Sequence, residues 1–457
     1  MAKTFPLYRC GLLAALLAIL ATGCSRQAVV EKSPDHAADE KTAPPTRSEA
    51  LPSVVGCDWG TINLPKERFD LTVLKQAGME TVVLAVNFGW HGAMRKYLPQ
   101  KIAGQPYPIR TFWNGRDSYD RDSVREVLNL VKQQHPTARI IVWLQVDTYP
   151  EWISENPGEA LRNDRGEPFV VNFHFQRAGN DPDPKKREVL AWSFYSQKLR
   201  EDMRPAIKEF VKTVESSPGG DQVAGYLIGG AQDAQFYLWE GPNGAKAKDA
   251  GAWSDYSKPA VQAWHAWLKK KYGTTQALSA AWNQKIESFD QAAPPPADSL
   301  IGTPRFHDPE TEERQRNWKE FIADGRVALA EDIAHMIRES ASRPLLIGTS
   351  SGDNGARANM TANVRLMNSK ELDFVNAPVR YNQRLAPASP GGALAVFDSF
   401  RLNNKPILFD LDYRTWKNKN YESQNLGPGY NVSARMVGRT STPEELRSAW
   451  LRETGRI

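Results

Sequence analysis

The chain has 457 residues, of which 41% are hydrophobic and 24% charged, and its formal net charge is +5 at pH 7. Lys3 and Arg9 contribute two of these positive charges, and the surplus of +3 in the rest is too small for a nucleic-acid-binding surface. The sequence therefore argues against a nucleic acid as partner. It is long enough for one large domain or two ordinary ones.

Residues 1–24 combine this basic start with the apolar run CGLLAALLAILATGC. The run is too short to cross a bilayer as a helix, and it is typical of a secretory signal peptide. Its end resembles a bacterial lipobox, although Ala21 stands where Leu is usual. We therefore expect Cys24 to be lipidated and to anchor an exported protein, with Ser25 favouring the outer membrane of a Gram-negative bacterium, on the periplasmic side. Cleavage of a signal peptide at another position is the alternative.

Residues 25–50 are rich in Pro, Ala and charge and have few side chains to bury, which predicts a flexible tether. Residues 51–457 are then expected to form the folded domain. Of the three cysteines, Cys10 lies in the predicted signal peptide and Cys24 at the lipidation site, so Cys57 has no partner for a disulfide. No histidine has a partner at metal-ligand spacing, so we expect no metal and no cofactor.

Strand-like and helical patterns alternate along the folded domain. The expected strands cover residues 53–59, 80–90, 138–147, 222–230, 344–351, 372–381 and 405–413. The expected helices cover residues 68–79, 122–136, 187–216, 314–339 and 444–457, and residues 258–283 are expected to form a helix, a turn and a second helix. This alternation predicts a mainly parallel α/β sheet, and the number of units favours a (β/α)8 TIM-barrel-like fold over an open doubly wound sheet. Seven strands are evident. We therefore expect either a barrel that lacks the final strand or a strand that the pattern does not reveal.

Catalytic residues of a TIM barrel lie at the carboxyl ends of its strands, where this sequence places polar and aromatic side chains. The residues that follow the second, third, fourth, sixth and seventh expected strands include Asn87, Trp90, His91, Asp147, Tyr149, Trp152, Asp233, Gln235, Arg380, Tyr381, Asp410 and Asp412. Asp410 and Asp412 stand two positions apart on one strand, so they are expected on the same face.

Two longer stretches resemble the β-galactosidases of glycoside hydrolase family 42. QVDTYPEWISENPGEALRNDRGE is similar to the loop after the third strand in that family, and AWHAWLKKKYGTTQALSAAWN is similar to its helical insertion after strand four. The resemblance spans about residues 55–450. It implies a retaining hydrolase of β-linked sugars, with one carboxylate as nucleophile and another as acid and then base. The nucleophile of the family, at the end of strand seven, maps onto Asp410.

The sequence departs from the family at the acid/base. The family has Asn-Glu at the end of strand four, and this pair falls on Gly230 and Ala231; with a different spacing, the Glu falls on Gln235. Neither Ala nor Gln transfers a proton, and Asp233 and Glu240 stand nearby as replacements. Loss of a general acid costs about 10²–10⁴-fold in rate. The alternative to a hydrolase is therefore a catalytically impaired carbohydrate-binding lipoprotein of polysaccharide assembly or retention.

The expected contacts with sugar are two indole rings for stacking and several polar side chains for the hydroxyl groups: Trp90, Trp152, Asn87, Asn376, Arg380, Tyr381 and Asp412. Core packing is the alternative for both indoles. Asp412 is also expected to hold Arg414 or a neighbouring backbone donor. A carbohydrate substrate and, through the lipid on Cys24, a membrane are the expected partners, and the sequence leaves the oligomeric state open.

Overall fold

The chain divides into two units, residues 1–50 and 51–457. The computed structural model describes residues 55–58, 71–76, 78–89, 101–102, 105–106, 110–168, 170–171, 189–230, 236, 255–300, 311–350, 359–378, 397–410, 414–415, 439–440, 442, 444 and 447–448. The predicted signal peptide, the lipidation site at Cys24 and the tether lie outside these residues. No helix in the described part of the second unit has the length and apolar character needed to span a membrane.

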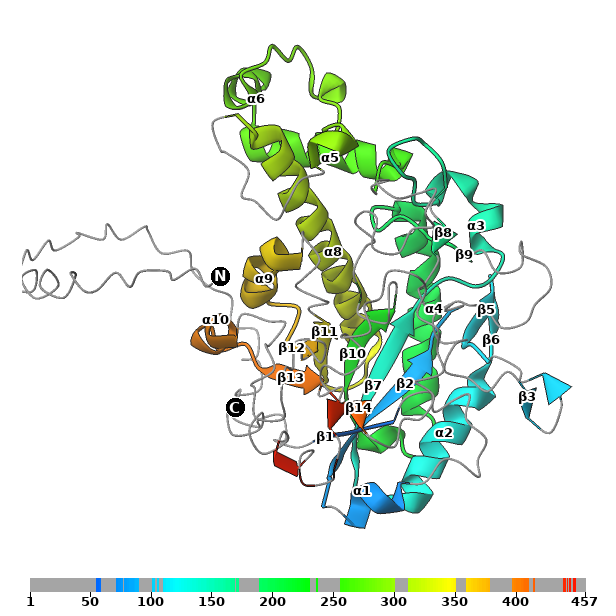
Figure 1. Ribbon diagram of the computed structural model, residues 1–457. Coiled ribbons are helices and arrows are strands. Elements are labelled where there is room, and N and C mark those ends of the chain that lie inside the picture. The colour runs from blue at the N-terminus through cyan, green and yellow to red at the C-terminus, as the bar shows by residue number, and fades with distance from the viewer. Residues whose placement is uncertain are drawn as a thin grey trace, which may run out of the picture. The chain divides into compact units, whose positions relative to one another are not determined.

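Seven parallel strands form the central sheet, and their order in space is their order in the sequence (Figure 1). The strands are β1 (Val55–Asp58), β2 (Thr81–Asn87), β7 (Arg139–Val146), β10 (Val223–Gly230), β11 (Leu346–Ser350), β12 (Phe374–Pro378) and β13 (Ile407–Asp410). Each lies within a segment predicted as a strand. The sheet curls as in TIM-barrel proteins, which confirms the predicted fold class, and β1 and β13 form the edges of the sheet in the part of the chain described here.

Helices occupy most of the connections between these strands. They are α1 (Thr72–Gln76), α2 (Arg121–Gln134), α3 (Trp152–Glu155), α4 (Gln197–Glu215), α5 (Lys258–Tyr272), α6 (Thr275–Trp282), α7 (Ala297–Leu300), α8 (Glu313–Ser340), α9 (Asn359–Asn368) and α10 (Phe397–Leu402). Short pairs of strands lie outside the main sheet: β3 (Lys101–Ile102) with β4 (Gln105–Pro106), β5 (Trp113–Gly115) with β6 (Ser118–Tyr119), β8 (Val170–Val171) with β9 (Val189–Leu190), and β14 (Arg414–Thr415) with β15 (Arg439–Thr440).

Side-chain caps decide where two helices begin. The N-cap of α2 is Asp120, whose Oδ1 accepts a 3.0 Å hydrogen bond from the amide of Ser123. The helix predicted over residues 187–216 begins only at Gln197, because the Ser196 hydroxyl accepts the amide hydrogen of Leu199 and so ends the non-helical segment. Val189 and Leu190, which the apolar pattern assigned to the helix, form β9 instead.

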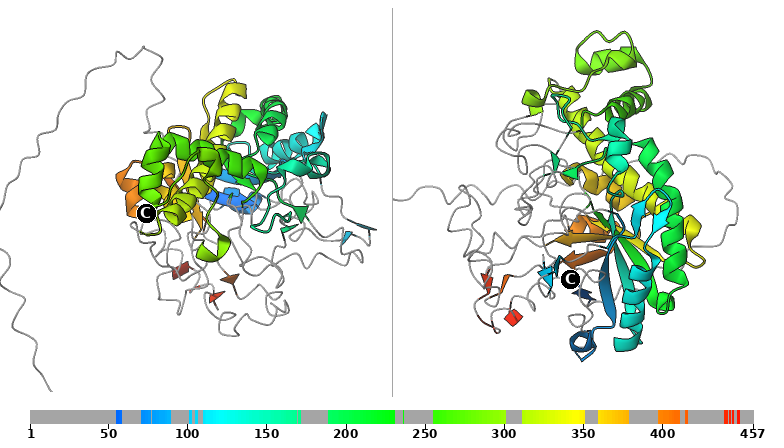
Figure 2. Two further views of the ribbon diagram at one scale, coloured as in Figure 1. Left: turned by 90° about the horizontal axis from the view of Figure 1, so that it is seen from above. Right: turned by 90° about the vertical axis from the view of Figure 1, so that its right-hand side faces the viewer.

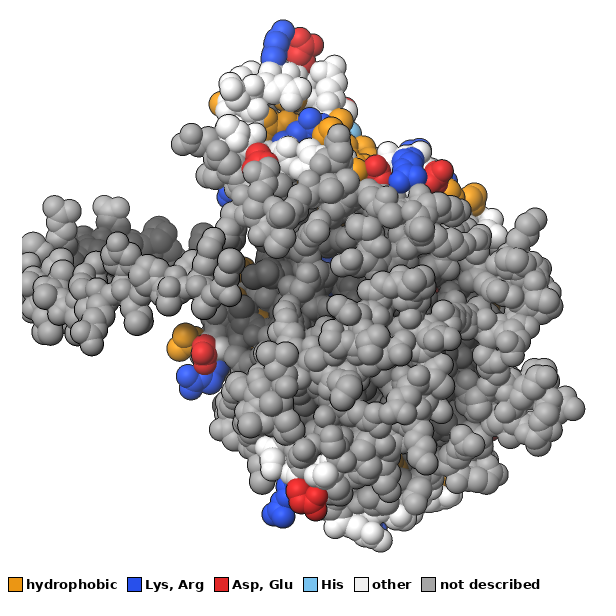
Figure 3. Space-filling view, viewed as in Figure 1, with side chains coloured by type: hydrophobic (Ala, Val, Ile, Leu, Met, Phe, Trp, Pro, Cys, Tyr) orange, Lys and Arg blue, Asp and Glu red, His pale blue; other side chains and the backbone are white. Residues whose placement is uncertain are grey.

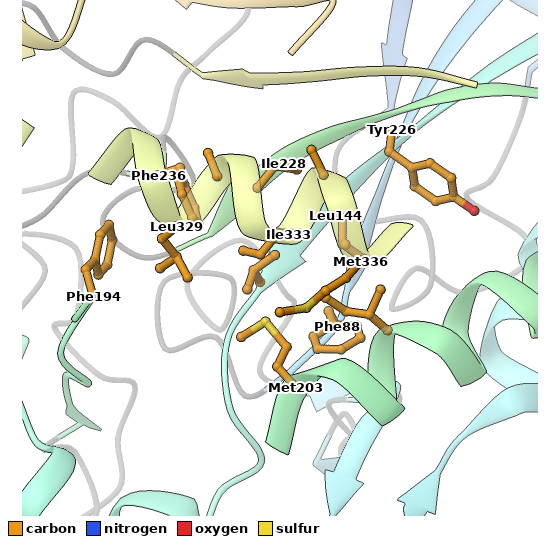
Figure 4. Packing of buried hydrophobic residues seen from close by; sticks show 14 of the residues in the cluster. Phe88, Leu144, Phe194, Met203, Tyr226, Ile228, Phe236, Leu329, Ile333 and Met336 are labelled. Atoms are coloured by element: carbon orange, nitrogen blue, oxygen red, sulfur yellow. The ribbon is translucent and has the colours of Figure 1, made fainter. Parts of the chain in front are cut away.

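The two faces of the sheet carry two separate apolar clusters, as the two-residue period of a strand requires. The larger cluster joins the outer face to α2, α4 and α8, which lie on one side of the sheet (Figure 2). In Figure 4, Leu329 and Ile333 of α8 pack over Leu144 and Ile228 of the strands. The smaller cluster lines the inner face and consists of Val83, Ala85, Ile141, Trp143, Leu227 and Phe374.

The predicted helical insertion after β10 packs on α8 through stacked indoles. The Trp264 ring lies 5.5 Å from that of Trp267 and 6.1 Å from that of Trp282, and it meets the Trp318 ring edge-on at 5.2 Å. Trp264 is fully buried, so these tryptophans build the core of the insertion. Exposed charges of both signs lie over α5 and α6 (Figure 3).

Candidate active site

A layer of buried polar residues crosses the inner face of the sheet where the strands end. Strand register places Asn87 beside Gln145, and Ser350 beside Asn376. Asn87, Gln145 and Asn376 each stand two positions after a member of the inner apolar cluster, so they continue the same face. Ser350 stands four positions after Leu346, which packs against that cluster. We call Asn87, Gln145, Ser350 and Asn376 the polar layer.

Three amide atoms of the polar layer have no hydrogen-bond partner among the described residues. They are Nδ2 of Asn87 and both Nε2 and Oε1 of Gln145, and the two side chains are 1% and 0% exposed. A buried amide group without a partner costs about 1–3 kcal/mol, and native interiors contain few of them. The neighbouring Asn376 differs, since its Nδ2 donates to the Leu408 carbonyl at 3.2 Å. On the β2 and β7 side of the layer, two buried amide nitrogens and one buried amide oxygen are therefore left without a partner among the described residues.

Asp147 follows β7 directly, at the same end of the sheet. Its Oδ1 accepts two hydrogen bonds, from the Trp192 indole at 2.7 Å and from the Thr148 amide at 2.8 Å. Burial raises the pKa of the Asp147 carboxyl to about 7, and the hydrogen bonds from Trp192 and Thr148 oppose that rise. The residue still keeps part of its surface accessible. Such a carboxyl gives up and regains a proton near neutral pH.

Two glycines allow the strand ends on either side of Asp147 to approach it closely. A Cβ atom on Gly89, after β2, would lie 2.1 Å from the Asp147 carbonyl oxygen. Gly230, the last residue of β10, has φ = +105°, and a Cβ there would lie 2.1 Å from the Val146 carbonyl oxygen. Only glycine fits this backbone without a shift. The family resemblance places the Asn of Asn-Glu at Gly230. This fold therefore has no room for a side chain at that position.

A buried arginine ties the ends of β10 and β11 together. Arg326 of α8 is 3% exposed and donates to the carbonyl of Phe236 at 2.8 Å and to that of Ser350 at 2.5 Å. Phe236 in turn donates its amide to the Gly230 carbonyl at 3.0 Å and has φ = +53°. These bonds hold the backbone on both sides of residues 231–235 near the polar layer.

The predicted site residues fall into four groups, of which Trp152 forms one by itself. Asp410 is the last residue of β13, in register with Pro378 of β12 and two positions after Leu408, which packs against the inner apolar cluster. Asn87 and Asn376 lie in the polar layer. The remaining predicted residues, apart from Trp152, lie outside the described part of the chain: Trp90, Asp233, Gln235, Glu240, Arg380, Tyr381 and Asp412.

Trp152 is fully buried at the start of α3, and its indole donates to Asp202 Oδ2 at 2.9 Å. In this structure the Trp152 ring lies among protein side chains and its N–H has a partner, unlike the Asn87 and Gln145 amide groups. Tyr149 is also buried, and its hydroxyl donates to Glu155 at 2.5 Å. Trp152 and Tyr149 thus stabilise the segment that follows β7 through packing and hydrogen bonds.

The sequence interpretation did not include Gln145 or Asp147 among the site residues. A signal for Gln145 was present, because it stands two positions after Trp143 in an otherwise apolar run and therefore shares a strand face with it. Asp147 was noted at the end of its strand. Its protonation behaviour depends on Trp192, 45 residues away in the chain, and no local pattern encodes that contact.

Comparison with known proteins supports the fold independently. The catalytic domain of a β-amylase from Paenibacillus polymyxa superposes with a TM-score of 0.53 at 12% identity, over 85% of this chain and 92% of that one. β-Galactosidases from the psychrophilic Marinomonas ef1 and from Bacillus circulans sp. alkalophilus both give TM-scores of 0.46, at 16% and 12% identity, over 72% and 88% of this chain. The chain spans 42% and 55% of the length of these two enzymes.

One protein family matches the chain at the level of sequence. Residues 232–432 match the family Glyco_hydro_42, described as beta-galactosidase. The matched segment begins just after β10 and includes α5, α6, α8 and the strands β11, β12 and β13. Over residues 232–432 the chain is therefore similar to the glycoside hydrolase family 42 β-galactosidases.

Proposed function

We propose that the protein is a retaining glycoside hydrolase that acts on β-linked sugars, with β-galactosides as the first substrates to test. The observation that carries this proposal is the polar layer at the catalytic end of a TIM-barrel sheet, where buried amide atoms of Asn87 and Gln145 have no partner among the described residues. A sugar ring presents hydroxyl groups that both donate and accept hydrogen bonds, which matches this set of amides. The match of residues 232–432 to a β-galactosidase family supports the same class of substrate.

In this proposal Asp410 is the nucleophile. Its carboxylate attacks the anomeric carbon, the bond to the leaving oxygen breaks, and a glycosyl ester forms on Asp410. A protonated group donates its hydrogen to the departing oxygen, and the same group, now ionised, then removes a proton from the water that hydrolyses the ester. The amides of Asn87 and Gln145 hold the sugar hydroxyls and so fix the anomeric carbon for attack.

The test is release of the aglycone from aryl β-D-galactosides by the wild-type protein and by Asp410→Asn. We expect Asp410→Asn to lose at least about 10³-fold in kcat, because an amide cannot form the ester. Asp398→Asn is the matched control, since Asp398 lies on α10 with its side chain 87% exposed. Equal activity of Asp410→Asn and wild type would contradict the proposed nucleophile.

A second candidate is a carbohydrate-binding lipoprotein without turnover, of polysaccharide assembly or retention. One observation favours it: Gly230 has no room for a side chain, and the family acid/base position beside it carries Ala231. In that case the amides of the polar layer bind sugar and no bond is cleaved. Binding of galactose-containing oligosaccharides in calorimetry, with no reducing ends released after prolonged incubation, would distinguish this candidate from the hydrolase.

We also propose that the protein is exported and held at the periplasmic side of the outer membrane by a lipid on Cys24. The apolar run of residues 10–24 and the small residues before Cys24 support this proposal. Replacing Cys24 by Ser is expected to move the protein from the membrane fraction to the soluble periplasmic fraction. Retention of the Cys24→Ser protein in the membrane fraction would argue against lipidation.

A further inference from the structure

Two desolvated aspartates in the described part of the chain differ in how their carboxyl oxygens are bonded. Asp255 is fully buried, its Oδ2 accepts from the Ser193 hydroxyl at 2.5 Å, and its Oδ1 accepts from the Ser257 amide at 2.8 Å. Both oxygens are occupied, as in a structural carboxyl. Both hydrogen bonds of Asp147 fall on Oδ1, and no donor among the described residues reaches Oδ2.

The position of Asp147 is next to the place where the family has its acid. β7 and β10 are adjacent in the sheet, and neighbouring strands lie only about 4.8 Å apart. Gly230, at the end of β10, packs against Val146 without a side chain between them. Strand register pairs Gly230 with Val146, so Asp147 directly follows the β7 residue that lies beside the end of β10.

An aromatic chain connects Asp147 to the segment after β10. Trp192, which donates to the Asp147 carboxyl, stacks on Phe194 with ring centroids 4.9 Å apart, and Phe194 lies 5.4 Å from Phe236. All three rings are buried. They fix the Trp192 indole, so that it holds Oδ1 and leaves Oδ2 as the oxygen able to carry a proton.

We infer that Asp147 is the proton donor of the proposed hydrolase, in place of the glutamate that strand four lacks. Oδ2–H transfers its proton to the glycosidic oxygen as the bond from that oxygen to the anomeric carbon breaks and Asp410 forms the glycosyl ester. The Asp147 carboxylate then takes a proton from water, whose oxygen attacks the anomeric carbon and releases Asp410. Burial of this carboxyl keeps the proton bound to about pH 7, which suits a general acid that works near neutral pH. The inference rests on the proposed function and replaces the expectation that Asp233 or Glu240 acts as the acid.

The dependence of rate on the leaving group tests this role. A 2,4-dinitrophenolate leaves without a proton, whereas phenol and methanol need one. Asp147→Asn keeps a side-chain oxygen to accept from Trp192 and Thr148 but carries no acidic proton. We expect the variant to retain kcat/KM on 2,4-dinitrophenyl β-D-galactoside within about tenfold and to lose about 10²–10⁴-fold on the phenyl glycoside.

Asp202→Asn is the matched control, because Asp202 also accepts an indole hydrogen bond, from Trp152 on α3. Structural damage from replacing such a carboxylate by an amide lowers the turnover of both substrates alike, so the control is expected to show no selectivity between them. A second readout needs only the wild-type protein. Its kcat/KM for the phenyl glycoside is expected to fall above about pH 7, whereas its kcat/KM for the dinitrophenyl glycoside is expected to stay constant there.

The outcomes separate this inference from the proposed function. Equal losses on both substrates in Asp147→Asn, or no loss on either, overturn the role of Asp147 and leave the hydrolase standing. A wild-type protein that releases no aglycone from any of these β-glycosides overturns the proposed function together with the inference. Selective loss in Asp147→Asn, with restored turnover and formation of a β-glycosyl azide when azide is added, supports both.

Discussion

The Trp192 indole donates a 2.7 Å hydrogen bond to Oδ1 of Asp147, across 45 residues of sequence. The bond occupies one oxygen of a carboxyl that burial keeps protonated to about pH 7. The other oxygen accepts no hydrogen bond from the residues described. This asymmetry gives Asp147 a chemical role that its position in the sequence alone does not indicate.

The stability of the folded protein is expected to depend on the protonation of Asp147. The carboxyl keeps its proton to about pH 7 when folded and loses it near the ordinary value of 3.8 when unfolded. The folded state therefore binds more protons between these values, so raising the pH from about 4 to about 7 lowers the free energy of unfolding. Asp147→Asn removes the contribution, and its free energy of unfolding relative to wild type should rise across this window by about 1–4 kcal/mol.

Denaturant titrations of both proteins at intervals from pH 4 to pH 8 measure this difference. The difference in free energy of unfolding should level off above about pH 7, where Asp147 has lost its proton in both the folded and the unfolded state. A difference that stays flat from pH 4 to pH 8 would mean that the carboxyl is not desolvated.

Trp192→Phe is expected to move the basic limb of the pH–rate profile to higher pH. The indole hydrogen bond lowers the pKa of Asp147, and a hydrogen bond to a charged group is worth about 1.5–3 kcal/mol, so its removal should shift the limb by about one pH unit. The measurement is kcat/KM for phenyl β-D-galactoside from pH 5 to pH 9. Trp152→Phe, which removes the indole bond to Asp202, is the control and should leave the limb in place. A shift toward lower pH in Trp192→Phe would contradict the assignment.

Gly230→Ala is expected to destabilise the protein by at least about 2 kcal/mol, because the new Cβ meets the Val146 carbonyl at 2.1 Å and φ is +105°. Gly158→Ala is the control, since a Cβ there has no atom within 4 Å, and its effect should stay within about 0.5 kcal/mol. Chemical denaturation of both variants gives the comparison. Equal stability of the two variants would mean that the end of β10 does not hold this close contact with β7.

Gln145→Met is expected to have opposite effects on stability and on sugar binding. It replaces an amide that has no partner among the described residues with an apolar side chain of similar size, so the free energy of unfolding should be unchanged or higher by about 1 kcal/mol. Affinity for the sugar should fall by about tenfold or more, because two hydrogen bonds to hydroxyls are lost. Thermal denaturation with and without galactose measures both quantities.

Gln222→Met is the control for this experiment. The Gln222 amide nitrogen donates to the His135 carbonyl at 3.1 Å and to the Ala138 carbonyl at 2.8 Å, just before β10. Its replacement should lower stability by about 1–3 kcal/mol and leave the response to galactose unchanged. A Gln145→Met protein that is destabilised as much as Gln222→Met would show that the Gln145 amide is satisfied within the protein.

The parallel sheet was predictable from the sequence because each strand covers one apolar run bounded by polar residues and turns. Both faces of the strand Thr81–Asn87 are buried, so its residues from Val82 to Val86 are all apolar and mark the element clearly. The start of α4 was not predictable from the sequence, because the apolar residues near Val189 suit a helix and a strand equally. The cap at Ser196 and the pairing of β9 with β8 decide between them.

Local sequence patterns specify which residues stand at the strand ends, because strand periodicity and the order of the elements can be read along the chain. They place Asn87, Asn376 and Asp410 at one end of the sheet. Which of the described polar groups there have hydrogen-bond partners depends on how distant segments pack together. Asn87 and Gln145 keep unpartnered amide atoms, and the carboxyl of Asp147 meets an indole from the far side of a long loop. Burial and hydrogen bonding depend on contacts between distant segments, and these contacts set whether a side chain packs, binds or carries a proton.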